Sequence, residues 1–462
     1  MSEEPRPRAS IRDLLRLART TNPGLTWALL VLTALSGLLP TAFSLASGAT
    51  IGALPEAVAS GRQSRLTTFL ALAVALFVLQ QAVGPVRETI ADALMVRVDT
   101  HMARRIMALT SAPPGIAHLE DPGTVDRLQQ AQGAIAGATP GGALYALAII
   151  WLRRLSGVAA LFVVASFRWW LALVIVGGQV LVFRWRRQAW DDQTSVIFRR
   201  SSALRRSAYT RGLATDPRTA KETRVFGLDR WLVERYRAEF GESMAPVWAA
   251  RRRGGLSTVG VALLVTVIQG GALLLVARAG VDGDIGVGAV VVFIQAVVGT
   301  VALGFFGEEH GRAADGLASL RVLQELEGEL PPAVDAPPGR PVNDLPRRAI
   351  RFESVGFRYP GRDTDVFVDL DLELEVGRST AIVGDNGAGK TTLAKLLAGL
   401  YEPTSGRITV DGIALAELDR PAWQRRVAAI FQDFVQYPFT AYDNVAVGAL
   451  ECRGDREGVM AA

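Results

Sequence analysis

The chain has 462 residues, of which half are hydrophobic and 21% are charged, and its formal net charge at pH 7 is +5. This length allows two or three domains. The positive charge does not indicate nucleic acid as a partner, because the basic residues cluster between apolar blocks, where membrane topology explains them better. The single cysteine, Cys452, excludes an internal disulfide framework.

Residues 1–24 are mainly polar and carry several arginines. They contain no short apolar core followed by a small-residue cleavage site, so we predict no signal peptide. We interpret this stretch as a cytoplasmic N-terminal segment.

Six apolar blocks follow between residues 25 and 329. Because a helix needs about 20 residues to cross a bilayer, we interpret each block as a transmembrane helix. They are Leu25–Ser47, Leu66–Val83, Ala143–Ala165, Trp169–Phe183, Leu256–Ala277 and Ile285–Phe306. The sequence therefore predicts a membrane α-helical bundle of six transmembrane helices, with the lipid bilayer as its surroundings. The alternative is a set of buried helices in a soluble protein, but six such blocks with such short links on one side would be hard to bury.

Loop charge predicts the orientation of these helices, because cytoplasmic loops carry an excess of Lys and Arg. Residues 184–253 contain 17 basic and 8 acidic residues and are therefore assigned to the cytoplasm. The N-terminal segment is assigned to the cytoplasm too, and six spans then place the C-terminal end there as well. The sequence thus predicts a multi-pass protein of the plasma membrane with both ends in the cytoplasm. Residues 86–142 and 184–253 are mainly helical in pattern, and we expect stalks that reach well beyond the bilayer.

Two arginines, Arg153 and Arg154, interrupt the third apolar block. A charge facing lipid would cost several kcal/mol. Either they line a water-filled translocation cavity, or the helix is long and they reach the cytoplasmic interface. We favour the second interpretation.

A proline-rich stretch, residues 330–348, predicts a stiff linker to a soluble domain at 349–462. In that domain the alternation of apolar residues predicts strands at Ile350–Phe357 and Phe367–Val376. The short apolar run Ser379–Val383 predicts a third strand, and Val427–Phe431, directly before Gln432, is also strand-like.

The third strand leads into GDNGAGKT, which has the P-loop spacing G-x-x-x-x-G-K-T. Glycines let backbone N–H groups face phosphate oxygens, Lys390 reaches the β- and γ-phosphates, and the Thr391 hydroxyl can coordinate Mg²⁺. The next helix repeats leucines at helical spacing and adds its N-terminal dipole. The predicted phosphate-binding residues are Gly384, Asp385, Asn386, Gly387, Ala388, Gly389, Lys390, Thr391 and Thr392.

With these motifs the chain resembles the ATP-binding-cassette (ABC) exporters, and the resemblance is most specific between Phe352 and Gly448. It implies a type IV exporter fold with a partial α/β P-loop NTPase domain. It implies that Tyr359, in FRYPG, stacks on adenine, and that Gln432, in AAIFQDF, contacts Mg²⁺ and the attacking water. Residues 116–131 and 219–228 resemble the segments that couple the membrane helices of this family to its nucleotide-binding domains.

The resemblance implies an ATP-driven half-transporter, of exporter type, that binds ATP and Mg²⁺ and pairs with a second subunit in a homodimer or heterodimer. The family's LSGGQ motif, the Asp-Glu that supplies a catalytic carboxylate, and the switch histidine do not occur after Gln432. We therefore name no catalytic residue, leave hydrolysis by this chain open, and expect a truncated form of a longer transporter.

Two other functions stay open from sequence. One is a membrane-bound ATP-binding protein without transport activity, and the other is an importer with the exporter fold. The spans contain no aromatic cage, metal-ligand cluster or acidic row, so the transported substrate is unknown.

Overall fold

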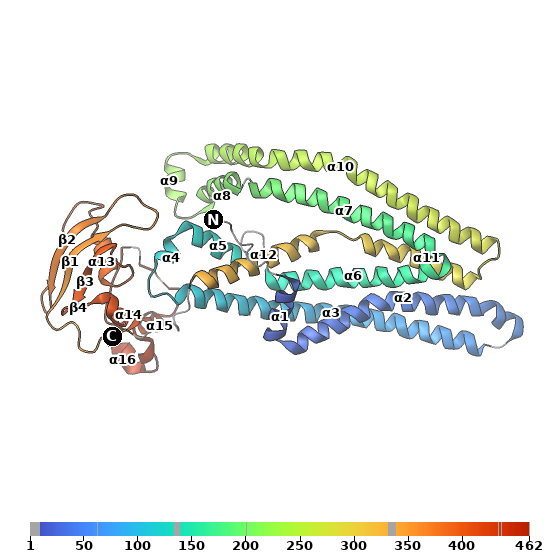
Figure 1. Cartoon of the computed structure of the whole chain (residues 1–462), viewed down its shortest axis with the longest axis horizontal. Helices are drawn as coiled ribbons and strands as arrows, with labels where there is room; N and C mark the ends of the chain where they lie inside the picture. Colours follow the sequence, from blue (N-terminus) through green and yellow to red (C-terminus); the bar gives the residue numbers. More distant parts are fainter. Residues whose placement is uncertain are drawn as a thin grey trace, which may run out of the picture. The chain divides into compact units, whose positions relative to one another are not determined.

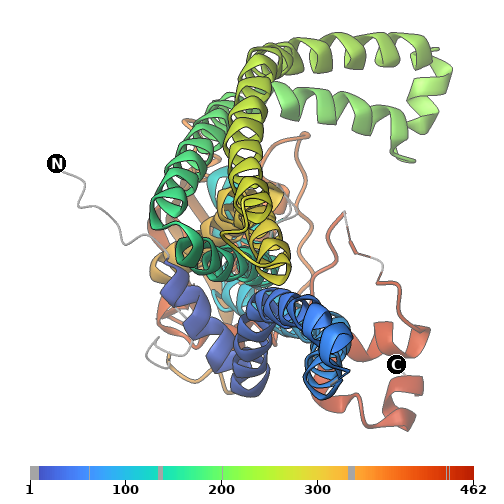
Figure 2. The same cartoon turned by 90° about the vertical axis from the view of Figure 1, so that its right-hand side faces the viewer.

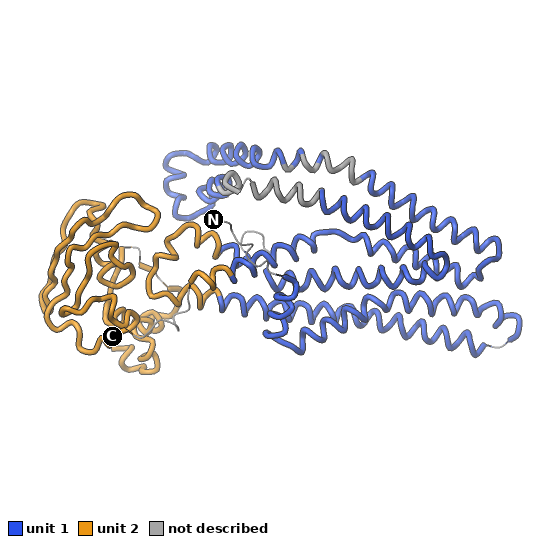
Figure 3. Tube along the Cα trace, in the orientation of Figure 1, with its two compact units in different colours: residues 1–105, 129–324 blue, residues 106–128, 325–462 orange. Residues whose placement is uncertain are grey.

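The computed structural model describes residues 10–61, 63–133, 139–199, 201–330, 339–432, 434–435 and 437–461. For residues 189–199, 201–205, 247, 250, 251 and 253–258 it describes the backbone only. The chain divides into two compact units, which are described separately (Figure 3). One comprises Met1–Arg105 and Gln129–Gln324, and the other comprises Ile106–Leu128 and Glu325–Ala462.

The first unit is helical in the part of the chain that the structure describes (Figures 1 and 2). Its helices, three of which continue across the division between the units, are α1 (Ile11–Thr21), α2 (Pro23–Ser60), α3 (Ser64–Ser111), α5 (Pro122–Ala131), α6 (Pro140–Phe167), α7 (Trp169–Arg199), α8 (Ser201–Thr215), α9 (Ala220–Val225), α10 (Asp229–Val281), α11 (Val287–Gly299), the 3-10 helix η1 (Thr300–Gly304) and α12 (Glu308–Glu329). Helix α2 packs against α6 and α11, and α10 packs against α7 and α8.

Five helical stretches are long and apolar enough to cross a membrane, as judged by length and composition among the described residues. They are Pro23–Ser60, Ser64–Ser111, Pro140–Phe167, Val259–Val281 and Val287–Glu329. They contain five of the six predicted spans, or most of each. The fourth predicted span, Trp169–Phe183, forms the first half of α7 but is not among the five. This apolar stretch is short, and Arg184, Arg186 and Arg187 follow it, so six spans stay a prediction.

Several helices extend far beyond the apolar stretches that they contain. Helix α10 has 53 residues, which at 1.5 Å per residue corresponds to about 80 Å. Its residues before Val259 run alongside α7 and α8, and α9 closes the end of this pair (Figures 1 and 2). The segments predicted as stalks are thus continuous helices over most of their described length.

Arg153 and Arg154 both find partners inside the first unit. The Arg153 guanidinium lies 4.2 Å from the centre of the Phe305 ring. Arg154 donates a hydrogen bond of 3.2 Å to the Phe305 carbonyl and lies 4.8 Å from the Phe183 ring centre. Aromatic faces and a carbonyl therefore contact these guanidinium groups, and the two interpretations of their place in the membrane stay predictions.

The second unit contains a four-stranded antiparallel sheet in the order β2-β1-β3-β4 (Figure 1). The strands are β1 (Ala349–Phe357), β2 (Phe367–Glu375), β3 (Ser405–Val410) and β4 (Ile413–Ala414). The helices are α4 (Ala117–Glu120), α13 (Lys390–Leu397), η3 (Leu415–Glu417), α14 (Arg420–Gln424), α15 (Ala441–Ala446), η4 (Val447–Cys452) and α16 (Arg456–Ala461). The two strands predicted from alternation, β1 and β2, are confirmed.

Helix α13 packs its predicted apolar face into the core of this unit. Leu393 and Leu396 are buried, and Leu397 and Leu400 are partly buried against the same cluster. Large fully buried side chains from β1 and α14 complete the core, among them Phe352 and Trp423. The sheet therefore fixes the position of α13, which carries the P-loop lysine at its first residue.

Two predicted strands are wrong. Ser379–Val383 and Val427–Phe431 are irregular in the structure. A strand needs a neighbour to accept and donate its backbone hydrogen bonds, and the described residues offer these two segments none. Their apolar side chains are consequently exposed, with Val383 at 90% and Ile430 at 92%.

The proline-rich linker is described only in part, since residues 331–338 lie outside the described residues. The part that follows packs on the second unit. Val342 is buried in its core, and the backbone of Arg340 donates to Glu417 and accepts from Asp419. Asp411 also accepts hydrogen bonds from the backbone N–H groups of Arg347 and two neighbouring residues.

Replacing Phe352 by Ala should destabilise the second unit by about 3–5 kcal/mol, because the ring is fully buried and its removal leaves a cavity. Thermal unfolding of the purified chain, followed by near-ultraviolet circular dichroism, measures the effect. The control is Phe439→Ala, since the Phe439 ring is 57% exposed. Equal losses from both substitutions would contradict the assigned core.

Candidate nucleotide-binding site

The P-loop backbone requires glycine at two positions for steric reasons. Gly387 and Gly389 have φ angles of 88° and 90°, a region that L-residues with side chains rarely adopt. A Cβ atom on Gly389 would also lie 2.8 Å from the Phe367 ring and 2.9 Å from Val366. The loop therefore passes close over the start of β2, and any residue other than glycine would push it away.

Helix α13 begins directly after this loop, and Gly389 is its N-cap. A glycine N-cap has no side chain that could accept the free backbone N–H groups of the first turn. These donors, with the positive end of the helix dipole, are available to an anion. The sequence thus builds an anion site from backbone alone.

Lys390 is folded back over the loop that precedes it. Its Nζ donates hydrogen bonds of 2.7 Å to the Gly384 carbonyl and 2.8 Å to the Asp385 carbonyl. Both acceptors are neutral, so the ammonium charge is not cancelled by a carboxylate at this place. The ammonium therefore lies at the loop that an anion would enter.

The two threonines after Lys390 face different surroundings. Thr392 is buried, and its hydroxyl lies 3.0 Å from the Tyr359 hydroxyl. Thr391 is exposed and can offer its oxygen to a ligand. A hydroxyl oxygen suits Mg²⁺, which prefers oxygen ligands and keeps several waters and phosphate oxygens.

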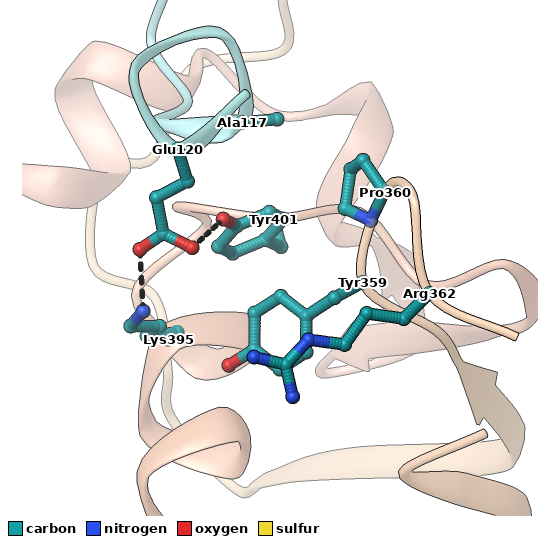
Figure 4. A pocket seen from close by; sticks show the side chains of 7 residues that line it. All are labelled: Ala117, Glu120, Tyr359, Pro360, Arg362, Lys395 and Tyr401. Carbon is teal, nitrogen blue, oxygen red and sulfur yellow. Dashed lines mark hydrogen bonds and ion pairs between the residues drawn. The ribbon is translucent and has the colours of Figure 1, made fainter. Parts of the chain in front are cut away.

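Tyr359 lies in a pocket of about 300 Å³ and is held by its neighbours (Figure 4). Its ring makes edge contacts with Phe357 at 4.9 Å and with Tyr401 at 5.3 Å. Arg362 lies over the ring at 5.8 Å, and Lys395 Nζ lies 5.5 Å from the ring centre. The structure therefore connects the predicted base-stacking residue to the P-loop helix through Thr392.

Gln432 is exposed and directly follows Val427–Phe431, the predicted strand that is irregular in the structure. Among the described residues no hydrogen bond joins Gln432 to the P-loop. The structure thus brings together Tyr359 and the P-loop, and it does not bring Gln432 to them.

Sequence reasoning missed an ionic cluster beside Tyr359, made by Glu120, Lys395 and Tyr401 (Figure 4). Lys395 Nζ donates to Glu120 Oε1 at 2.7 Å, and the Tyr401 hydroxyl donates to Glu120 Oε2. Glu120 ends α4, far from the other two residues in sequence. The one usable signal was the scarcity of lysine, since Lys395 is one of three lysines in the chain.

Backbone contacts fix the segment that carries Glu120. The Ile116 N–H donates to the Leu400 carbonyl at 3.1 Å, and Gln424 donates to the Pro114 carbonyl at 2.6 Å. Ile116 and Ala117 also pack against the core of the second unit. Residues 106–128 thus dock on the domain that holds the P-loop, within one compact unit.

The cluster shifts the acidity of its members in opposite directions. Desolvation alone would raise the pKa of Glu120, but the hydrogen bonds from Lys395 and Tyr401 outweigh it and hold this pKa below its usual range. Burial and the neighbouring carboxylate raise the pKa of Tyr401. Glu120 is therefore a carboxylate and Tyr401 a neutral donor at neutral pH.

Replacing Glu120 by Gln should weaken the docking of residues 114–120 by about 1 kcal/mol, because a partly exposed ion pair and a charged hydrogen bond are lost. Hydrogen exchange of the Ile116 amide should become about fivefold faster. The docking should also weaken as the pH falls through the lowered pKa of Glu120, since the folded state holds this carboxyl ionised.

The control for this change is Glu402→Gln. Glu402 forms an ion pair with Arg420 in the same unit, and its side chain is 66% exposed. Exchange at Ile116 should not respond to it. Unchanged exchange in the Glu120 variant would show that the cluster does not hold α4.

Comparison with known proteins identifies the domain that contains this site. Residues 367–461 match the family model described as ABC transporter. The chain is 39% identical over 106 residues to the subtilin transport ATP-binding protein SpaT of Bacillus subtilis, covering 23% of this chain and 17% of that protein. It is 47% identical over 107 residues to an ATP-dependent lipid A-core flippase of Ralstonia nicotianae, covering 23% and 18%.

A longer match includes part of the helical region. The chain is 28% identical over 245 residues to an ATP-dependent lipid A-core flippase of Nitrosococcus oceani, covering 52% of this chain and 40% of that protein. The matches thus span less than half the length of these relatives. The expected resemblance is confirmed: the chain is similar to ABC exporters, with an ABC transporter domain fused to apolar, membrane-type helices.

Proposed function

We propose that this chain is an ATP-driven membrane transporter, a half-transporter of exporter type. The observation that carries the proposal is the P-loop geometry, in which Lys390 and the free N–H groups of α13 face an anion site made of backbone. Its fusion to the five apolar helical stretches found among the described residues supports transport over a soluble nucleotide-dependent activity. ATP-driven transport is also the function in the names of two relatives, which are called ATP-dependent flippases.

In this proposal the residues from Gly384 to Thr392 bind the phosphates of ATP. Lys390 moves from the carbonyls of Gly384 and Asp385 to the β- and γ-phosphates, since it gains a charged partner there. The Thr391 hydroxyl and, after movement of its segment, the Gln432 side chain coordinate Mg²⁺, which supplies charge neutralisation between the phosphates when bound. Tyr359 stacks on the base.

The apolar helices form a multi-pass bundle in the plasma membrane, and both chain ends lie in the cytoplasm. The supporting observation is the basic excess of residues 184–253. A second subunit, identical or related, completes the transporter. The relatives' names mention subtilin and lipid A-core, so they do not favour one substrate for this chain.

Replacing Lys390 by Ala should lower the affinity for ATP by about 100-fold, because a charged hydrogen bond to the phosphates is lost. Equilibrium binding of labelled ATP with Mg²⁺ to the purified chain measures this. Lys221→Ala is the matched control, since Lys221 is exposed on α9. Retention of wild-type affinity in the Lys390 variant would refute the P-loop assignment.

Replacing Tyr359 by Ala should weaken ATP by about tenfold, the contribution of one stacked base, and leave inorganic triphosphate unaffected. Tyr359→Phe keeps the ring and removes only the hydroxyl contact to Thr392, so it should keep most of the ATP affinity. Competition of both ligands against labelled ATP provides the comparison. Equal losses for ATP and triphosphate would eliminate the stacking role.

A further inference from the structure

Helix α1 separates two hollows in the surface of the first unit. It packs against α2 and α6 (Figure 1), with Leu14, Leu17 and Ala18 buried. Its arginines Arg12 and Arg16 are four residues apart and therefore share one face, and both are exposed. The helix is therefore amphipathic, with a basic outer side, as in helices that lie at a membrane surface.

The hollow beneath α1 is an apolar cavity of about 350 Å³. Its walls come from α1, α2, α3 and α6, and include Ile11, Leu15, Leu94, Leu144 and Trp151. This volume is within the range of small-ligand sites. The lining is almost entirely hydrocarbon, so its occupant has an apolar part.

One polar group in this cavity lacks a partner. Thr33 lines the cavity and is 6% exposed, and its hydroxyl is buried without a hydrogen-bond partner among the described residues. A buried hydroxyl without a partner costs free energy. An occupant with an oxygen near its hydrocarbon part would relieve that cost.

The second hollow is an open, shallow surface on the outer side of α1, lined by that helix alone among the described residues. Arg12, Arg16 and Arg19 line it, together with Leu15, which also lines the apolar cavity. Arg19 lies over the Trp27 ring at 5.3 Å, and Arg16 lies 3.7 Å from Asp13. Within the described part of the chain Arg12 has no ion-pair partner. The two hollows thus meet at Leu15, one basic and one apolar.

We propose that α1 and these two hollows bind one anionic phospholipid. An acyl chain occupies the apolar cavity, the phosphate lies at Arg12 and Arg16, and an ester oxygen accepts a hydrogen bond from Thr33. A lipid fits better than a soluble anion because the apolar cavity opens beside the apolar helices α2 and α6, whose Leu30 and Trp151 side chains line it and are exposed. This proposal does not depend on nucleotide binding.

The test uses the full chain, purified in detergent, stripped of lipid and mixed with equal amounts of phosphatidylglycerol and phosphatidylcholine of the same acyl chains. Native mass spectrometry counts the lipids retained. We expect one phosphatidylglycerol per chain, favoured at least tenfold over phosphatidylcholine, since each arginine near an anionic headgroup contributes about fivefold.

Three variants make the test specific. Arg12→Gln with Arg16→Gln should remove the preference for phosphatidylglycerol, whereas Arg237→Gln, at an exposed position of α10, should keep it. Ala34→Phe places a ring in the cavity from an exposed position and should lower the retention of both lipids. Because Ala34 is exposed, this variant keeps the test valid if the arginine variant does not fold.

Three outcomes would overturn the proposal. They are equal retention of the two lipids by the wild-type chain, a preference that survives the double arginine substitution, and full displacement of phosphatidylglycerol by water-soluble glycerol phosphate. The last result would assign the arginines to a soluble anion. Wild-type retention in Ala34→Phe would be a fourth such outcome, because it would exclude the cavity as the acyl-chain site.

Discussion

The close approach of the P-loop to the first residue of β2 is the constraint on which the candidate nucleotide site depends. Gly389 combines a left-handed φ with ring contacts that leave no room for a Cβ atom. This contact sets where α13 begins and therefore where Lys390 and the free backbone donors lie. Because β2 pairs with β1 along nearly its whole length, the site is anchored in the sheet rather than in the loop itself.

The elements that sequence predicted well are those specified by local pattern. The alternation that predicts β1 and β2 can be recognised within each segment alone. The same holds for the leucine spacing of α13 and for the glycine spacing of the P-loop. The runs Ser379–Val383 and Val427–Phe431 are different, because a short, mainly apolar run becomes a strand only when a neighbouring strand pairs with it. Local sequence could not show whether those neighbours are present, and here Val383 and Ile430 are exposed instead.

The cluster around Glu120 could not be predicted for a related reason. Glu120 and Lys395 are 275 residues apart, and no periodicity in either segment indicates the other. Composition carried a partial signal, since a lysine is a rare choice in a chain whose cations are almost all arginines. A lysine ammonium is compact and has three donors, which suits a site where it lies near Glu120 Oε1 and two tyrosine rings at once.

The geometry of these rings links the proposed stacking of a base on Tyr359 to the docking of α4. Tyr401 donates to Glu120 and also makes an edge contact with Tyr359, while Lys395 lies near both rings. A base that stacks on Tyr359, as proposed, must share this pocket with Arg362 and meets the cluster that holds α4. Coupling between two sites is reciprocal. If the bound base changes the free energy of α4 docking, then docking changes the free energy of base binding by the same amount. The segment that follows α3 is therefore placed to respond to the nucleotide through side chains of one compact unit, without requiring that the sheet or the P-loop backbone move.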